Sequence, residues 1–325
     1  MMLTVNIDTE AVVKNYLFFK QISSSFIPML KANCYYHGNG LMKTVLKLST
    51  RICVDSVSDA MLAKRFKEDL TVFILGGIIS RGDIKELNHL GLIPVLGDSN
   101  IEYAEEGDIY AAFVYNKFSC IRRNCRTLRN IHNPVMIFDH VNSFENPYIS
   151  NAIHDYTHVK DLPICVGSTV STLRKVNPTF ATPRIGLGLY GYSPDKEEYS
   201  DLSPVKCVHA VVLDDLSFSD FVGYGYLHKS PYKYVISAGE FDNLLLHNVP
   251  LKSLHNPKAN IRLIPHMNMV HSYIASDVPL PIGSTIELLG NNVRADSIAK
   301  DANVSVANVL KLGVQYAPHT ENISR

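Results

Sequence analysis

The chain has 325 residues, 46% of them hydrophobic, and its 31 basic side chains balance its 31 acidic ones. This length suffices for one large domain and a smaller one. The even charge argues against a nucleic-acid or anionic-membrane binder. The first ten residues carry no basic run, and the longest apolar stretch, 71–79, is too short to span a bilayer. We therefore expect a soluble cytoplasmic protein.

Six cysteines lie at positions 34, 53, 120, 125, 165 and 207, without a Cys-x-x-Cys pair. Four of them are in or beside apolar runs, where a free thiol packs as a small hydrophobe. We therefore expect neither disulfides nor a structural zinc site, and we assign no metal.

The N-terminal segment predicts a short strand followed by a helix. Residues 5–8 alternate as a strand does, and Asp8 or Thr9 can cap a helix from Glu10 to about Gln21. The apolar side chains of this segment follow one helical face.

Eight short apolar runs follow, about 19 to 28 residues apart. Several are apolar throughout, which is typical of parallel strands covered on both faces. Eight such strands with crossover helices predict a TIM-like (β/α)8 barrel over residues 1–200. A doubly wound open sheet is the competing interpretation. The runs are centred near Met29, Cys53, Ile74, Pro94, Phe113, Ile137, Cys165 and Ile185.

The pattern changes after Pro194. Residues 195–199 are charged and are interpreted as a linker. From Val205 the runs alternate, are β-branched and are joined by Gly, Asn and Pro turns, so they predict an all-β domain over residues 201–325. A stretch from Ala295 to Leu312 is predicted to be partly helical.

Candidate chemistry is concentrated in residues 28–40. An apolar run ends there in Lys31, and two tyrosines and His37 follow. Because a buried ammonium is costly, this lysine is either paired with an acid or a better nucleophile than usual, able to form a Schiff base with an aldehyde. The alternative is a surface lysine that precedes a turn, since short motifs give many false positives.

A barrel would place function at the carboxyl ends of its strands. Lys31 ends the first run, Ser168 follows the seventh, and Arg184, Gly186 and Gly188 lie in the eighth. Loops after the seventh and eighth strands often bind phosphate. An amine nucleophile with a phosphate cradle suits pyridoxal phosphate, an aldehyde with a phosphate group. Close packing or a turn explains the two glycines equally well.

Several segments resemble the alanine racemase family. Residues 30–38, LKANCYYHG, are similar to its VKANAYGHG signature, and residues 184–191, RIGLGLYG, to RPGIALYG. Residues 222–225 read VGYG, as in the family, and the opening of the chain and residues 283–299 are also similar. The resemblance spans nearly the whole chain in order. It implies a (β/α)8 barrel followed by a β-domain, and head-to-tail homodimers in which the partner's β-domain completes each active site.

The resemblance implies the activity and the roles of residues. The enzyme would be an isomerase that interconverts L- and D-alanine and so supplies D-alanine for peptidoglycan. Lys31 would hold pyridoxal phosphate and move a proton on one face of the substrate Cα, and Tyr224 of the partner would act on the other face. The other implied contacts are Arg184 at the pyridine nitrogen, His140 beside the ring, Tyr35, Ser168, Gly186 and Leu187 at the phosphate, the Met267 backbone at the substrate carboxylate, and Arg122 at the substrate.

Taken alone, three of these residues have simpler interpretations. Tyr224 could be an ordinary hairpin aromatic, His140 a structural histidine, and Arg184 a surface residue or ion-pair partner.

The chain also departs from the family pattern. Asn268 replaces the aspartate of CMD, Glu240 the tyrosine of GYADG, and Gly167 the asparagine before the phosphate serine. Residues 113–117 read FVYNK, with no lysine at the place where the family's HLKxDTGMxRLG has one, and Arg122 or Arg123 only approximates its arginine. The closing RVPR is replaced by QYAPH. These departures leave two alternatives open, which are a racemase of another small amino acid such as serine, and a degenerate pyridoxal-phosphate-binding protein with little activity.

Overall fold

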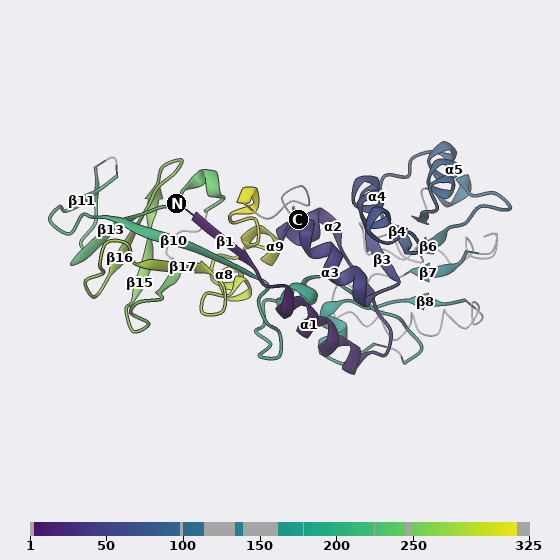
Figure 1. Cartoon of the computed structure of the whole chain (residues 1–325), viewed down its shortest axis with the longest axis horizontal. Coiled ribbons are helices and arrows are strands. Elements are labelled where there is room, and N and C mark those ends of the chain that lie inside the picture. The colour runs from purple at the N-terminus through teal and green to yellow at the C-terminus, as the bar shows by residue number, and fades with distance from the viewer. Residues whose placement is uncertain are drawn as a thin grey trace. The chain divides into compact units, whose positions relative to one another are not determined.

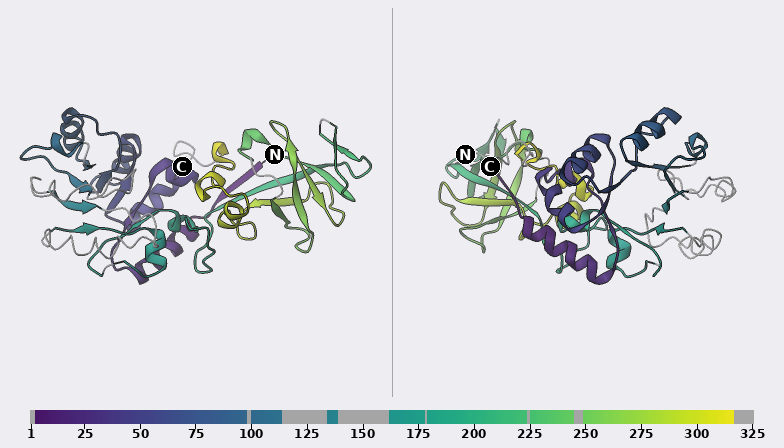
Figure 2. Two further views of the ribbon diagram at one scale, coloured as in Figure 1. Left: turned by 180° about the vertical axis from the view of Figure 1, so that it is seen from behind. Right: turned by 45° about the vertical axis from the view of Figure 1, so that its right-hand side comes forward.

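The structure is a computed structural model that describes residues 3–97, 100–113, 134–138, 162–177, 179–223, 225–244 and 249–316. The chain forms two compact units (Figures 1 and 2). The parallel-sheet unit contains Tyr16–Cys34 and Met42–Leu189, and the antiparallel-sheet unit contains Met1–Asn15, Tyr35–Leu41 and Tyr190–Arg325. A single boundary near residue 200 does not describe this division, because two N-terminal segments join the second unit.

Within the described residues, the parallel-sheet unit contains eight strands. Six pair in chain order, and they are β3 (Arg51–Val54), β4 (Thr71–Ile74), β5 (Ile93–Leu96), β6 (Ala111–Phe113), β7 (Met136–Phe138) and β8 (Ile164–Cys165). The first strand, β2 (Ile27–Pro28), pairs in parallel with the last, β9 (Arg184–Ile185). A bridge of Met29 with Cys53 joins β2 to β3. The eight predicted runs all fall on or beside these strands, so their prediction is confirmed.

The strand order is that of a barrel rather than of a doubly wound sheet, because the first and last strands are neighbours. Between β8 and β9, the Thr182 N–H donates to the Ile164 carbonyl at 2.9 Å, and the Arg184 N–H donates to the Gly167 carbonyl at 3.3 Å. The described strands thus form a curved parallel sheet, at least a half-barrel. A complete (β/α)8 barrel stays a prediction, because most of the chain between β6 and β8 is outside the described residues.

Short helices alternate with the strands along the chain, and most lie between consecutive strands (Figure 1). Asp8 caps α1, since its Oδ1 accepts from the Glu10 N–H at 2.8 Å and the Ala11 N–H at 3.0 Å. The predicted cap and helix are therefore confirmed. The helices are α1 (Thr9–Ile22), α2 (Lys31–Tyr36), α3 (Gly40–Leu48), α4 (Val57–Phe66), α5 (Arg81–His89) and α7 (Thr169–Leu173), with 3-10 turns η1 (Ile101–Tyr103) and η4 (Leu187–Tyr190).

The second unit contains a seven-stranded antiparallel sheet, which confirms the predicted all-β domain. Its order is β1-β10-β13-β16-β15-β14-β17, and β10 also pairs with β17. These strands are β1 (Leu3–Ile7), β10 (Lys206–Asp215), β13 (Tyr232–Ile236), β14 (Pro250–Ser253), β15 (Ile261–Met267), β16 (Ser272–Ser276) and β17 (Thr285–Leu289). A hairpin of β11 (Phe221–Val222) with β12 (Tyr226–Leu227) projects from the unit (Figure 1).

The N-terminal strand β1 belongs to this sheet and pairs with β10 from Leu3 opposite Ala210 to Ile7 opposite Lys206. The helical stretch predicted near the C-terminus is confirmed as α8 (Ala295–Asp301) and α9 (Val306–Val309). The unit also has 3-10 turns η5 (Glu240–Asp242) and η6 (Val314–Tyr316).

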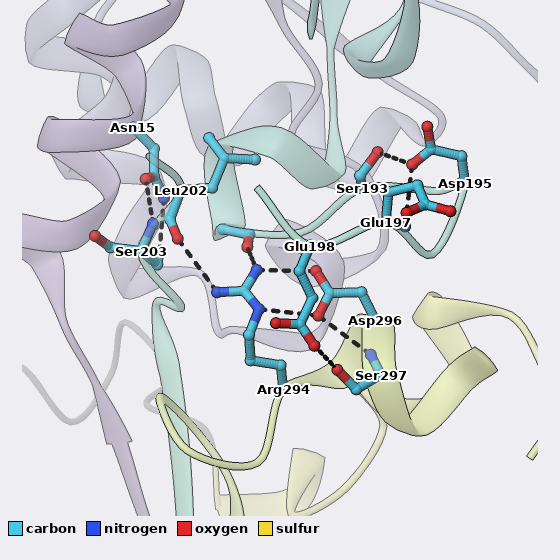
Figure 3. A network of polar contacts seen from close by, with 11 residues as sticks. Asn15, Ser193, Asp195, Glu197, Glu198, Leu202, Ser203, Arg294, Asp296 and Ser297 are labelled. Carbon is cyan, nitrogen blue, oxygen red and sulfur yellow. Dashed lines mark hydrogen bonds and ion pairs between the residues drawn. The ribbon is translucent and has the colours of Figure 1, made fainter. Parts of the chain in front are cut away.

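A polar network fixes the segment that enters the antiparallel sheet (Figure 3). Arg294 pairs with the buried Asp296 at 2.8 Å and donates to the carbonyls of Gly191 at 2.8 Å and Leu202 at 3.3 Å. Asn15 exchanges two hydrogen bonds with the Ser203 backbone, at 2.8 and 2.9 Å. The charged segment 195–199 is therefore followed by a firmly held entry to β10.

Every helix within the described ranges is too short or too polar to cross a lipid bilayer.

Candidate active site

Lys31 lies at the carboxyl end of β2. The two preceding residues hold this segment between neighbouring strands, because Met29 N–H donates to Ile185 at 2.8 Å and Leu30 N–H donates to Cys53 at 2.9 Å. Lys31 Nζ lies 3.2 Å from Asp55 Oδ2, and the side chains are 33% and 35% exposed. Asp55 directly follows β3, so the parallel pairing brings the two together. Of the two alternatives for a lysine at this place, the structure shows the one paired with an acid. Its partner could have been sought at the end of the adjacent strand.

The helix that begins at Lys31 is left-handed. All five residues from Ala32 to Tyr36 have φ values between +51° and +66°. This conformation costs L-residues roughly 1–2 kcal/mol each. Such strain persists only where the surrounding structure enforces it, and it is concentrated at functional sites. The structure thus marks the predicted signature as a strained segment rather than an ordinary turn.

Tyr35 lies in this left-handed helix, and its ring centre is 5.1 Å from that of Tyr190. The buried His37 ring stacks on Tyr190 at 4.6 Å, and its Nδ1 donates to the Tyr35 carbonyl at 2.8 Å. Tyr35 and His37, which closely follow Lys31, thus both pack on the ring of Tyr190.

Arg184 is buried in the parallel-sheet unit, with only 5% of the residue exposed. Its Nη1 donates to the Cys165 carbonyl at 3.2 Å, and its guanidinium lies 5.1 Å from the Phe138 ring centre and 5.9 Å from that of Phe113. The surface interpretation of Arg184 is therefore wrong. Because β9 pairs with β2, a permanent positive charge lies on the strand next to the one that carries Lys31.

The turn after β8 and the segment after β9 are joined by Thr169, which sequence reasoning missed. The Thr169 hydroxyl accepts from the N–H groups of Gly186 at 3.2 Å and Gly188 at 3.3 Å. The predicted phosphate residues Ser168, Gly186 and Leu187 are therefore in neighbouring turns. A Cβ on Gly188 would lie 2.4 Å from the Phe19 ring, so close packing explains that glycine.

Gly167 departs from the family pattern for a visible reason. Its φ is +106°, and a Cβ there would lie 2.3 Å from Asn177 Oδ1. Asn177 Nδ2 donates to the Thr172 hydroxyl at 2.8 Å, and that hydroxyl donates to the Ser168 carbonyl at 2.8 Å. A carboxamide from residue 177 thus fills the space beside the Ser168 turn, where a side chain at 167 would lie.

The predicted substrate contact Met267 and the two departures Asn268 and Glu240 all lie in the antiparallel-sheet unit. The Met267 backbone pairs with Ser272 at the end of β15. Asn268 Oδ1 accepts from the N–H groups of Val270 at 3.0 Å and His271 at 2.7 Å. An aspartate oxygen would accept the same two hydrogen bonds. The replacement of the family's aspartate by Asn268 therefore preserves the turn. Glu240, which replaces a tyrosine, is exposed at the start of η5.

Tyr224, His140 and Arg122 lie outside the described residues. The residues on either side of Tyr224 are Gly223 and Gly225, with φ values of +55° and +92°, between β11 and β12.

The residues that follow β2 and β8, together with Arg184 at the start of β9, fit pyridoxal phosphate. Lys31 offers an amine for an aldehyde carbon, Arg184 a fixed positive charge, and Ser168 a hydroxyl for a phosphate. Among the described residues, no group of three or more His, Cys, Asp or Glu side chains could hold a metal ion.

No protein-family model matches the chain, but comparisons with individual proteins find similarity to alanine racemases. It is 21% identical over 336 residues to an alanine racemase of Wigglesworthia glossinidia brevipalpis, covering 93% of this chain and 94% of that protein. The alanine racemase structure of Pseudomonas aeruginosa is 16% identical with a TM-score of 0.82, and 98% of each chain is covered.

Two further solved structures share this fold. The Bartonella henselae alanine racemase with covalently bound pyridoxal phosphate is 18% identical with a TM-score of 0.81, over 96% of this chain and 98% of that one. A histidine racemase of Leuconostoc mesenteroides is 17% identical with a TM-score of 0.75, over 96% and 95%. The resemblance to the alanine racemases is thus confirmed along nearly the whole chain, which shares the fold of their solved structures.

Proposed function

We propose that the protein is a pyridoxal-phosphate-dependent alanine racemase that interconverts L- and D-alanine in the cytoplasm and supplies D-alanine for peptidoglycan. The placement of Lys31 carries this proposal. It ends β2 beside Asp55, next to the strand of Arg184, in a chain related to alanine racemases. The covalently bound pyridoxal phosphate of the Bartonella henselae enzyme supports the choice of cofactor.

Pyridoxal phosphate, when bound, supplies an electron sink that makes the α-proton of an amino acid acidic. Lys31 Nζ would hold the cofactor and, once a substrate amine has replaced it, move a proton on one face of Cα. Arg184 cannot lose its proton, and it would lie near the pyridine nitrogen. His140 would pack beside the ring.

The phosphate would be held by the turns around Thr169. We assign the Ser168 hydroxyl, the Tyr35 hydroxyl and the backbone of Gly186 and Leu187 to it. The substrate carboxylate would be met by the Met267 backbone and by Arg122.

Racemisation needs a second proton-transfer group on the opposite face of Cα. We assign that role to Tyr224 of a second copy of the chain, in a homodimer with shared active sites. The exposed apolar side chains around the hairpin support this assignment, since such patches on soluble proteins mark interaction sites. Phe218, Phe221 and Leu227 are 87%, 54% and 60% exposed.

The decisive experiment adds L-alanine in heavy water to the protein loaded with pyridoxal phosphate. NMR follows loss of the α-proton signal, and a D-amino-acid assay follows D-alanine. We expect both, with no activity and no bound cofactor in Lys31→Ala. Tyr224→Phe is expected to keep the cofactor and to lose racemisation by roughly 10²–10⁴-fold. Full racemase activity in Tyr224→Phe would exclude the two-group assignment.

A second candidate is a racemase of another amino acid. It is favoured by the histidine racemase among the structural neighbours and by exposed Glu240 in place of a tyrosine. Serine and histidine, offered beside alanine in the same exchange experiment, test it. A degenerate cofactor-binding protein is the third candidate, and cofactor absorbance without exchange of any α-proton would identify it.

A further inference from the structure

Asp55 is held next to Lys31 by regular structure on both sides. It follows β3, which is buried from Ile52 to Val54, and precedes α4, whose N-cap Ser56 accepts from the Asp59 N–H at 3.1 Å. The parallel contact of β2 with β3 then fixes the separation between Lys31 and Asp55. The 3.2 Å ion pair is therefore a product of strand order rather than of two flexible surface side chains.

Other charged residues lie on the elements next to this pair. Asp59 lies in the first turn of α4, and Arg184 lies on β9, the other neighbour of β2. Burial is the largest cause that raises the pKa of Asp59, the Ser56 hydroxyl opposes it, and the negative charge of Asp55 adds to it. Asp55 is thus close enough to influence Asp59, and it forms the ion pair with Lys31.

We propose that Asp55 is the positioning residue of the Lys31 amine, holding Nζ in place and stabilising the ammonium that forms when Lys31 takes the α-proton. The second part rests on the proposed racemase function. In that step the Cα–H bond breaks, Nζ gains the proton, and the electron pair stays with the substrate and its pyridoxal phosphate. A carboxylate about 3 Å from the new ammonium favours that product. When the proton returns to Cα, the same carboxylate keeps Nζ aligned.

The first test needs neither cofactor nor activity. Formaldehyde with cyanoborohydride methylates only uncharged amines, and peptide mass spectrometry reports the extent at Lys31 over a range of pH. We expect Lys31 in Asp55→Asn to react roughly three- to tenfold faster at neutral pH, with its profile moved to lower pH, because its ammonium has lost the adjacent anion. Asp55→Glu is expected to restore most of the wild-type profile.

Asp69→Asn is the matched control, because Asp69 is an exposed carboxylate in the turn between α4 and β4. It is expected to leave the Lys31 profile unchanged. An Asp55→Asn protein that melts as the wild type does and shows the wild-type Lys31 profile would overturn the proposal.

The second test measures α-proton exchange separately from L- and D-alanine. Asp55→Asn is expected to keep cofactor absorbance and to slow exchange roughly tenfold or more for the enantiomer that Lys31 deprotonates, leaving the other within about twofold. Equal slowing of both enantiomers, or loss of the cofactor, would indicate a merely structural role. If the wild type exchanges neither enantiomer, the proposed function fails, and Lys31 methylation still decides the role of Asp55.

Discussion

At the scale of single residues, Gly167 shows how the Ser168 turn is built. Its φ of +106° is unfavourable for any side chain, and Asn177 occupies the adjoining space. The Asn177 carboxamide is linked through Thr172 to the carbonyl of Ser168. An asparagine at position 167 and the carboxamide of Asn177 cannot both be accommodated without a rearrangement.

Gly167→Ala is therefore expected to lower the free energy of unfolding by about 2–3 kcal/mol and to weaken pyridoxal phosphate binding. Urea denaturation and cofactor titration measure the two effects. Gly77→Ala is the matched control in the same unit, since Gly77 has a φ of +82° but no atom within 4 Å of a new Cβ. It carries the backbone strain without the clash, so equal losses in the two variants would contradict the packing argument.

Lys206 is a second residue whose behaviour depends on burial. It is fully buried in β10, and its Nζ donates to the carbonyls of Tyr36 at 3.2 Å and Leu310 at 3.0 Å. Burial lowers the pKa of Lys206 from 10.5 to about 7. Its ammonium therefore ties the end of the left-handed helix to the end of α9 at an electrostatic cost.

The pH dependence of stability follows from this lowered pKa. Between about pH 7 and pH 10.5 the unfolded chain binds a proton at Lys206 that the folded chain does not, so stability increases with pH in that window. Lys206→Met is expected to remove this increase, on the order of a few kcal/mol. Urea denaturation from pH 7 to 10 measures it, with exposed Lys258→Met as the control. Parallel curves for wild type and Lys206→Met would refute it.

At the scale of elements, α2 is the segment in which local preference and the fold disagree. Nothing in the side chains of residues 32–36 favours five consecutive left-handed residues. The strands on either side fix where the chain leaves β2, and Tyr190 packs on Tyr35 and His37. Tertiary packing therefore imposes this conformation against the intrinsic preference of the chain.

Substituting glycine for alanine should consequently have opposite effects in two helices. Ala32→Gly is expected to raise the free energy of unfolding by about 1 kcal/mol, because the exposed Ala32 has a φ of +51° and glycine relieves its strain. Ala60→Gly in α4 is expected to lower it by about 1 kcal/mol or more, since Ala60 is buried in a right-handed helix. Thermal or urea denaturation gives both signs, and destabilisation by Ala32→Gly would exclude the strain argument.

At the scale of the whole molecule, the proposed homodimer predicts that two inactive variants restore activity when they form a mixed dimer. Lys31→Ala and Tyr224→Phe are each expected to be inactive. If each site takes Lys31 from one chain and Tyr224 from its partner, a mixed dimer of the two variants keeps one intact site. Unfolding and refolding the variants together should then restore roughly a quarter of wild-type activity.

The racemase assay on the refolded mixture measures this recovery, and each variant refolded alone is the control. If Lys31 and Tyr224 acted within one chain, no mixed dimer would contain a complete site. Absence of activity, with dimers present by analytical ultracentrifugation, would therefore contradict the shared site.

Local patterns in the sequence predict much of the fold and identify the candidate nucleophile. The eight apolar runs mark the parallel strands, and Asp8 marks the start of α1, because burial and helix capping leave local patterns. Lys31, Arg184 and Ser168 stand out because each follows or lies in such a run. Residues 114–133 and 139–161 are not described, so His140 and Arg122 remain predictions.

Which distant residues contact one another follows from how the strands are arranged in the fold. Asp55 lies 24 residues from Lys31 and contacts it because β2 and β3 are neighbours. The Thr169 hydroxyl accepts from Gly186, which lies 17 residues further along the chain. Strand β1 pairs with β10 rather than with a strand near it in the sequence. A local pattern records whether a residue is buried or caps a helix, but not its partner, because the partner depends on strand order and register. For that reason the sequence identifies the lysine, and the fold alone identifies the carboxylate beside it.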